Sequence, residues 1–140
     1  MQGVSVADDL RQMLARLKCA SGASDSSIRE SEARLGFNFP VEYIAFLKLT
    51  NGGEGFIGEE YAIFWNVEEL AEANADYQVH EYAAGLLIFG SNGGGEAYGF
   101  DTRREPWPVV RMPFVGMNWG QAISIGDSFS EFLERLHGAE

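Results

Sequence analysis

Residues 35–53 constrain the fold of this chain more than any other stretch, because they combine two helix ends and one helix start in a fixed register. Gly36 is typical of the left-handed residue that closes a helix, and Pro40 suits the first turn of the next helix. The rest of the pattern is an apolar stripe at helical spacing followed by a closing turn: Tyr43, Phe46, Leu47, Asn51, Gly52 and Gly53. The stretch contains no nucleophile, no metal-ligand set and no phosphate-binding motif, so it predicts structure rather than chemistry.

The same register, with Glu32 three residues before Leu35, resembles the N-terminal signature of the Smi/Knr-like (SUKH) superfamily. The resemblance continues through Ile-Phe-Gly-Ser-Asn-Gly-Gly-Gly-Glu-Ala-Tyr-Gly-Phe-Asp at 88–101 and closes with Ser-Phe-Ser-Glu-Phe-Leu at 128–133. It implies a small α+β domain, usually a bacterial immunity protein that neutralises a toxin, often a nuclease. In fungi, related domains regulate cell-wall glucan synthesis. The resemblance implies no catalytic residues.

Hydrophobic periodicity and capping signals predict helices at both ends of the chain and strands between them. Helices are expected over about 6–17, 27–36, 40–50, 66–73 and 128–138, with Ser27, Asn66 and Ser128 as side-chain N-caps. Strands are expected over 61–65, 86–89, 97–101, 109–111 and 123–125, whereas 76–85 fits either a loop or a helical turn. This order predicts an α+β fold in one domain spanning 1–140. Its central sheet, antiparallel or mixed, would have about four to six strands, with N-terminal helices and a C-terminal helix packed on it.

Composition restricts the class of protein. An apolar fraction of 46% in 140 residues is enough for a packed core. No apolar run approaches the ~20 residues that cross a bilayer, and the first residues lack the basic flank and apolar run of a secretory signal. Cys19 is the single cysteine, so no intrachain disulfide can form and a reducing compartment is expected. We therefore expect a cytoplasmic protein that does not bind membranes.

The net charge of −11 arises entirely from the second part of the chain. Residues 1–50 carry six basic and six acidic side chains, whereas no Lys or Arg lies between Lys48 and Arg103. The carboxylates of that segment are Glu54, Glu59, Glu60, Glu68, Glu69, Glu72, Asp76, Glu81, Glu96 and Asp101. A field of one sign repels phosphates, which disfavours direct binding of nucleic acid, and it steers a basic protein toward the segment. The alternative is that the charge only keeps the protein soluble.

Motifs for enzyme chemistry are absent or incomplete in the sequence. The glycines at 90–95 follow a predicted strand, but no lysine or helix start follows them, so a hairpin turn explains them better than a phosphate loop. His80 and His137 share no metal-ligand spacing, and we expect neither a metal nor another cofactor. Paired acids at 59–60 and 68–72 could in principle serve a hydrolase, but such carboxylates are ordinarily solvated. An acid-rich hydrolase is therefore the weaker alternative to a non-enzymatic protein.

Glu32 lies on the same predicted helical face as Ile28 and Leu35. A carboxylate on an apolar face must accept hydrogen bonds or raise its pKa. It could serve as a general acid, but no catalytic partner is placed near it in the sequence. We therefore favour a structural role, in which Glu32 accepts backbone N–H groups from a neighbouring turn and fixes a pair of helices.

Residues 107–119 combine aromatic and methionine side chains with prolines and glycines. Trp107, Phe114 and Trp119 stand out, because aromatic side chains on irregular backbone are typical of partner-binding patches. Tryptophan also belongs to many cores. The sequence leaves both alternatives open for this segment.

We predict a non-enzymatic protein-binding module, and specifically an immunity protein whose acidic surface binds a basic toxin domain. A regulatory domain of the cell-wall type is the alternative within the same binding class. The residues expected to contact the partner are six carboxylates and three aromatic side chains: Glu54, Glu59, Glu60, Glu68, Glu69, Glu72, Trp107, Phe114 and Trp119. The oligomeric state is not readable from the sequence.

Overall fold

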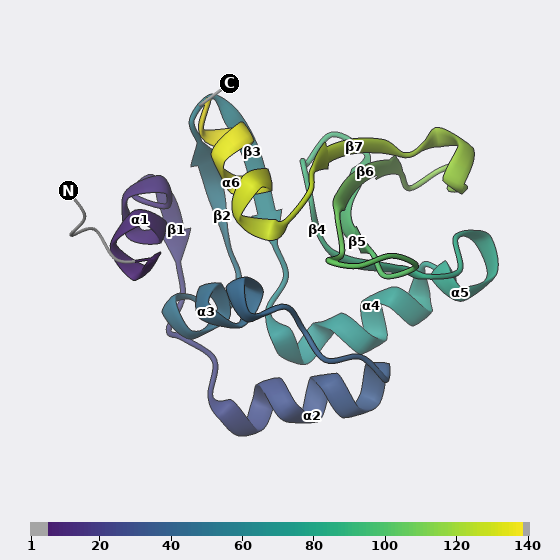
Figure 1. The fold of residues 1–140 in the computed structure, drawn as a ribbon, viewed down its shortest axis with the longest axis horizontal. Coiled ribbons are helices and arrows are strands. Elements are labelled where there is room, and N and C mark those ends of the chain that lie inside the picture. The colour runs from purple at the N-terminus through teal and green to yellow at the C-terminus, as the bar shows by residue number, and fades with distance from the viewer. Residues whose placement is uncertain (1–5, 139–140) are drawn as a thin grey trace.

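Residues 6–138, the part of the chain that the computed structural model describes, form one seven-stranded sheet with helices packed against it (Figure 1). The helices are α1 (Val6–Met13), α2 (Asp25–Leu35), α3 (Val41–Leu49), α4 (Leu70–Asp76), α5 (Val79–Tyr82) and α6 (Phe129–His137), with 3-10 turns η1 (Val67–Glu69) and η2 (Trp119–Gln121). The strands are β1 (Leu17–Cys19), β2 (Gly53–Ile57), β3 (Glu60–Phe64), β4 (Leu86–Ser91), β5 (Glu96–Asp101), β6 (Val109–Pro113) and β7 (Ile123–Gly126). Over these residues, no helix is both long and apolar enough to span a membrane.

The seven strands of this part of the chain pair in sequence order, and every pairing is antiparallel. The α+β class and the antiparallel sheet are therefore confirmed, but the expected count of about four to six strands was too low. The two strands that were missed are β1 and β2. β1 begins where the first helix was expected to end, and β2 replaces an expected glycine turn.

β1 and β2 form because they pair with other strands of the sheet, and no local sequence pattern marks them. β1 has only three residues, too few to show an alternating pattern, and its Leu17 pairs with Gly55 of β2. Gly55 has a φ of +150°, and a Cβ at this position would lie 2.7 Å from the carbonyl oxygen of Arg16. Glycine is a poor strand former, yet only glycine permits this close approach.

A serine side chain caps the N-terminus of both α2 and α6, as predicted, but the cap of α2 lies three residues earlier than expected. Its N-cap is Ser24, whose Oγ accepts a hydrogen bond from the N–H of Ser27, the residue predicted as the cap. Gly36 closes the same helix in the left-handed conformation, with a φ of +82°, as predicted. The Oγ of Ser128 accepts from the N–H of Glu131 at 3.1 Å, which confirms the predicted N-cap of α6.

The sheet divides between β3 and β4. These strands pair only through Ile63 with Ser91 and Phe64 with Gly90, and the part from β4 to β7 curls away from the rest (Figure 1). A Cβ at Gly90 would lie 2.2 Å from the carbonyl oxygen of Ile63, so this junction requires glycine. The register of β4 against β5 also shifts between Ile88 and Gly90, which is typical of a β-bulge.

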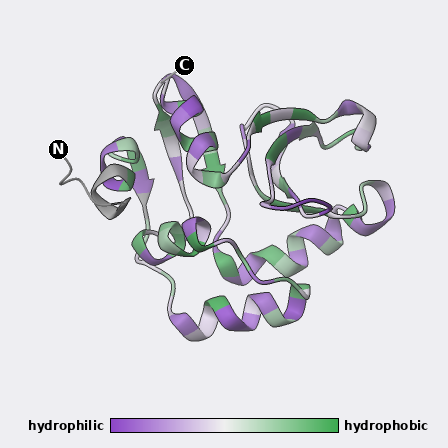
Figure 2. Cartoon of the chain, viewed as in Figure 1, coloured by the Kyte–Doolittle hydropathy of each residue, from purple (hydrophilic) through white to green (hydrophobic). Residues whose placement is uncertain are grey.

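The two faces of β4, β5 and β6 contribute to two different hydrophobic cores, and the larger of the two cores also includes side chains of β2 and β3. Leu87 and Phe89 of β4 belong to the larger core, whereas Leu86 and Ile88 belong to the smaller one, as the alternation of side chains along a strand requires. Figure 2 shows hydrophobic stretches along β4 to β7 and mainly hydrophilic residues on α2. In the larger core, Tyr43 contacts five aromatic rings: Phe39, Phe46, Phe89, Phe100 and Phe129.

The buried side chain of Asn74, on α4, takes the place of a missing strand next to β4. Its Nδ2 donates to the carbonyl oxygen of Ile88 at 2.9 Å, and its Oδ1 accepts from the N–H of the same residue at 2.8 Å. Nδ2 also donates to the carbonyl oxygen of Leu70. Buried backbone groups are almost always paired. Asn74 therefore satisfies β4 where β3 no longer reaches it, and it holds α4 against the sheet.

We expect Asn74→Ala to lower the free energy of unfolding by about 3 kcal/mol, because it leaves two buried backbone groups of Ile88 without partners. The isosteric Asn74→Asp should also destabilise the protein, since it replaces the Nδ2 donor by a charged acceptor facing a carbonyl oxygen. Urea unfolding followed by circular dichroism measures both effects. Glu72→Gln on the exposed face of α4 is the matched control and should change stability by less than ~0.5 kcal/mol. A stable Asn74→Ala variant would contradict this role.

The hydroxyl of Tyr43 is buried in the larger core without a hydrogen-bond partner. Burial disfavours the charged form and raises the pKa of this phenol far above its ordinary value. Burial, together with the charge of Glu60, also raises the pKa of Tyr98 to about 12. A tyrosine in the unfolded chain loses its proton near pH 10, whereas the folded protein retains it. Stability must therefore fall as the pH rises above about 10, because unfolding then releases protons.

The variant Tyr43→Phe should keep or raise the free energy of unfolding at pH 8, because it removes an unpaired buried polar group and preserves the ring. It should also lose less stability than the natural protein between pH 10 and pH 12, since one of the shifted phenols is absent. Unfolding curves in urea at pH 8 and pH 11 test both statements. A loss above ~1 kcal/mol at pH 8 would mean that the hydroxyl has a stabilising partner.

Candidate partner-binding site

An open hollow with acidic and aromatic walls lies along the exposed face of α4. We call it the acid–aromatic groove, and its volume is about 350 Å³. The groove is lined by Trp65, Glu69, Glu72, Ala73, Asp76 and Tyr77. Residues 69, 72, 73, 76 and 77 follow helical spacing, so one face of the η1–α4 segment supplies nearly all of the lining. The opposite face is buried through Leu70 and Asn74, and this burial is what turns the carboxylates toward solvent.

Three aromatic rings form a row beside these carboxylates. Trp65 and Tyr77 are nearly parallel, with ring centroids 6.2 Å apart, and Tyr77 stacks on Phe114 with centroids 4.5 Å apart. Phe114 and Trp65 pack against the smaller core, whereas Tyr77 is 42% exposed. The row therefore combines a fixed base with an accessible ring. Aromatic faces next to carboxylates favour cationic side chains, through cation–π attraction and charge pairing.

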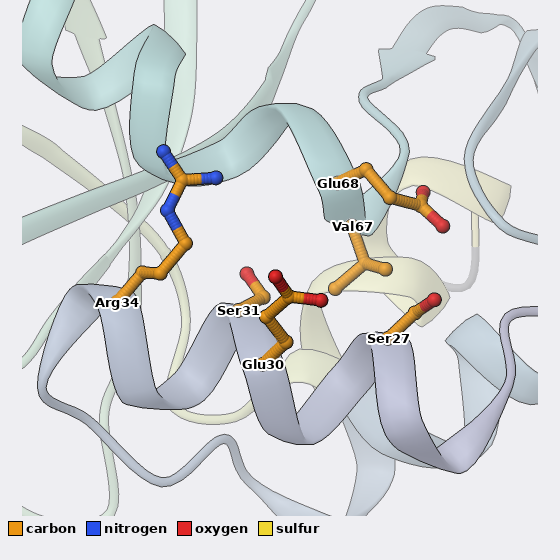
Figure 3. Close-up of a pocket in the computed structure, with 6 residues that line it drawn as sticks. All are labelled: Ser27, Glu30, Ser31, Arg34, Val67 and Glu68. Carbon is orange, nitrogen blue, oxygen red and sulfur yellow. The ribbon is translucent and has the colours of Figure 1, made fainter.

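A second, smaller hollow lies on the other side of η1, between η1 and α2. We call it the α2–η1 pocket, and its volume is about 110 Å³. Figure 3 shows its lining residues Ser27, Glu30, Ser31, Arg34, Val67 and Glu68. Hydrogen bonds from Asn51, from its own backbone N–H and from Ser27 hold the pKa of the Glu68 carboxyl below its usual range. Glu68 therefore stays ionised at neutral pH and below.

Asn51 positions η1 next to α2. Its Oδ1 accepts from the N–H of Val67 at 2.7 Å, and its Nδ2 donates to Glu68 Oε1 at 2.8 Å. The side chain of Asn66 makes no capping hydrogen bond, so the prediction that Asn66 caps this segment was wrong. The cap comes from a residue fifteen positions earlier in the chain, which no local pattern could reveal.

The carboxylates predicted to bind a partner do not form one surface. Glu54, Glu59 and Glu60 lie on the β2–β3 hairpin. Glu59 and Glu60 are at its turn, at the end of β3 remote from α4 (Figure 1), whereas Glu54 pairs with Ile63 near the other end of β3. Glu69 and Glu72 line the acid–aromatic groove, and Glu68 lines the α2–η1 pocket. The three acids at 68–72 are therefore divided between two hollows, with Glu69 and Glu72 in the groove and Glu68 in the pocket. No group of metal-binding side chains occurs in the described part of the chain.

The sequence left open whether the aromatic side chains of residues 107–119 belong to the core or to a partner-binding patch, and the structure places them in different surroundings. Trp107 is 9% exposed and packs edge-on against Phe37 in the larger core, so its position favours the core. Phe114 supports the exposed ring of Tyr77, as described above. Trp119 is half-buried: its Nε1 donates to the carbonyl oxygen of Ala84, and the guanidinium of Arg103 lies 3.5 Å above its ring.

The sequence reasoning missed Trp65, Tyr77 and Ser31 as site residues. Trp65 was assigned only to a strand, and Tyr77 fell in a segment of ambiguous structure. The helical spacing of residues 69, 72, 73, 76 and 77 was a usable signal, because it places acids and an aromatic ring on one face. No sequence signal distinguishes Ser31 from the other serines of α2.

The structure contains a hydrogen bond of the kind predicted for Glu32. Its Oε2 accepts a hydrogen bond of 2.7 Å from the N–H of Phe39, in the connection between α2 and α3. The other signature residues also build structure: Gly52 lies so close to β3 that a Cβ would be 2.7 Å from the carbonyl oxygen of Phe64. The residues of the signature thus fix the connection between α2 and α3 and the close approach of Gly52 to β3.

We expect Glu32→Ala to lower the melting temperature by several degrees, because the N–H of Phe39 loses its acceptor at a cost of ~1–3 kcal/mol. Glu32→Gln keeps an oxygen acceptor and should lose less. Glu30→Ala, an exposed position on the same helix, is the control. Differential scanning calorimetry measures all three variants. If Glu32→Ala melted like the natural protein but no longer bound its partner, the structural assignment would have to be abandoned.

Comparison with known proteins adds one finding to this geometry. The model of the SMI1 / KNR4 family (SUKH-1) matches residues 22–135. The match therefore begins just before α2 and ends within α6, and it includes the groove and the pocket. No curated protein gives a significant match.

Proposed function

The chain belongs to the SMI1 / KNR4 family (SUKH-1), and from this premise we propose that it is a non-enzymatic protein-binding module of the immunity type. Its partner would be a basic bacterial toxin domain in the cytoplasm, with a nuclease as the chemically simplest case. A nuclease must present basic side chains to phosphates. An acidic protein that covers those side chains blocks substrate access by charge and by bulk.

The observation that carries this proposal is the acid–aromatic groove. Its carboxylates come from Glu69, Glu72 and Asp76, and no basic side chain lines it. The stacked rings of Trp65 and Tyr77 offer the flat, rigid contact area from which protein interfaces take much of their affinity. Anchoring and charge complementarity therefore occur at the same place.

Two physical effects would act in sequence during binding. The net charge of −11 attracts a basic partner over a distance of about one Debye length and raises the association rate. The groove then holds an arginine or lysine side chain against the aromatic faces, an interaction worth ~0.5–2 kcal/mol for each cation. Steering thus acts mainly on association, whereas the anchored contacts act on dissociation.

We expect the tagged chain to capture a basic toxin domain from a lysate of the source organism, with a yield that falls between 0.05 M and 0.5 M salt. Mass spectrometry identifies the partner, and stopped-flow mixing should show association slowing by about ten-fold or more over that range. A rate independent of salt would contradict the electrostatic mechanism. Recovery of cell-wall enzymes instead would support the regulatory alternative that the family also contains.

Matched variants test whether the groove is the contact surface. Glu69→Gln combined with Glu72→Gln removes two charges from the groove, and Glu59→Gln combined with Glu60→Gln removes two from the β2–β3 hairpin. Both pairs change the net charge equally, so steering should weaken equally. Only the groove pair, or Tyr77→Ala, should also accelerate dissociation of the captured partner. If the partner dissociated at the same rate from both double variants, the contact surface would have to lie outside the groove.

A further inference from the structure

Another hollow lies on the side of α4 that faces away from the acid–aromatic groove. It is bounded by Leu35 and Phe37 at the end of α2, by Ala71 and Ala75 on α4, and by Leu86 at the start of β4. We call it the apolar cleft, and its volume is about 310 Å³. Helical spacing places its α4 residues on the face of the helix opposite to the carboxylates of the groove. The cleft and the groove are therefore separate sites.

The buried part of the cleft lining is apolar. Val79, Leu86 and Leu87 are each at most 5% exposed. Among the described residues of the lining, Asn74 is the one buried polar side chain, and both donors of its amide and its oxygen already bond to backbone groups. A polar group placed against these residues would find no partner, and burial of an unpaired polar group is unfavourable. The inner part of the cleft therefore selects an apolar moiety.

Two hydrogen-bond donors, Arg34 and His80, stand at the exposed edge of the cleft. Figure 3 shows the guanidinium of Arg34 extending from α2 toward the helix that continues from Val67 and Glu68. None of the ion pairs within residues 6–138 involves Arg34, although Glu30 lies one turn away on the same helix. No acidic side chain of the described residues lines the cleft. The charge of Arg34 is thus available to an external anion.

An apolar interior with a cationic edge matches one class of small molecule, an aliphatic monocarboxylate. A carboxylate accepts two parallel hydrogen bonds from a guanidinium, and even a neutral imidazole can donate another. The volume of the cleft lies at the lower end of the ~300–1,000 Å³ that is usual for small-molecule sites, so the aliphatic chain must be short. An ammonium group would meet Arg34 as a like charge.

We propose that the apolar cleft binds a short-chain aliphatic carboxylate, with the chain against Val79, Leu86 and Leu87 and the carboxylate on Arg34. This site goes beyond the proposed function and does not depend on it, because the cleft and the groove occupy different faces of α4. The net charge of −11 repels anions in general. Binding of an anion here must therefore come from the local geometry of the cleft.

The test is a titration of the 15N-labelled chain with sodium hexanoate at pH 7 and constant ionic strength, followed by NMR amide shifts. We expect saturable shifts at residues 34–37, 71–80 and 85–87, with a dissociation constant on the order of millimolar, as suits so small a ligand. From butanoate to hexanoate the affinity should rise about four-fold for each methylene, because each one leaves water. Hexylamine, which is protonated at this pH, should give no saturable shifts in the cleft.

Matched variants separate the charge of the cleft from its shape. Arg34→Gln should weaken hexanoate binding by about five-fold, the upper end for an exposed ion pair. Arg29→Gln removes the same charge from the same helix, but outside the cleft, and should leave the affinity unchanged. Ala71→Leu fills the cleft with a good helix former and should abolish binding, while circular dichroism checks that the variant is folded.

Several results overturn the proposal. They are the absence of saturable shifts in the cleft, equal binding of hexylamine, equal affinity in Arg34→Gln and Arg29→Gln, and an affinity independent of chain length. N-acetyl-leucine, which mimics the C-terminal residue of a polypeptide, should bind more weakly than hexanoate, because its amide would lie against apolar side chains. Tighter binding of N-acetyl-leucine would overturn the assignment to a free acid. Failure of hexanoate to bind would leave the proposed function untouched, since none of these measurements involves the groove.

Discussion

The side-chain amide of Asn74 pairs with both backbone groups of Ile88, and the layout of the molecule depends on this pairing. The sheet divides after two residue pairs between β3 and β4, which would leave buried backbone of β4 without partners. By supplying those partners, Asn74 fixes α4 against β4. The opposite face of α4 must then point to solvent, because residues four apart share a helix face. The acid–aromatic groove is that face.

The residues that mark the fold also determine the geometry of the candidate site. Asn51 ends the signature and, through Val67 and Glu68, holds η1 in place. Glu32 fixes the connection from α2 to α3 by accepting the N–H of Phe39. Because η1 and α2 supply lining residues of the acid–aromatic groove and of the apolar cleft respectively, residues with structural roles set the spacing that a ligand meets. Binding sites depend on such support for their precision.

The net charge and the geometry of the candidate site would act on a partner over different distances. The acidic segment gives a long-range field, which depends on total charge and hardly on where each carboxylate lies. Anchored binding requires carboxylates, rings and hollows at one place. Of the six predicted carboxylates, Glu69 and Glu72 lie together with Trp65 and Tyr77 in one hollow, whereas the hairpin acids do not line it.

The sequence alone determined the α+β class, the helix end at Gly36, the cap of α6 and the bond-accepting role of Glu32, because short-range chemistry dictates each of them. It also determined the sign of the protein's own net charge, from which we predict a basic partner. The presence of β1 and β2 and the identity of the residue that caps η1 follow only from the tertiary structure, since their hydrogen bonds join residues far apart in the chain. The same holds for the core position of Trp107 and for the unpaired hydroxyl of Ser31. Burial and pairing across the fold are properties of the whole packing, and no local spacing encodes them.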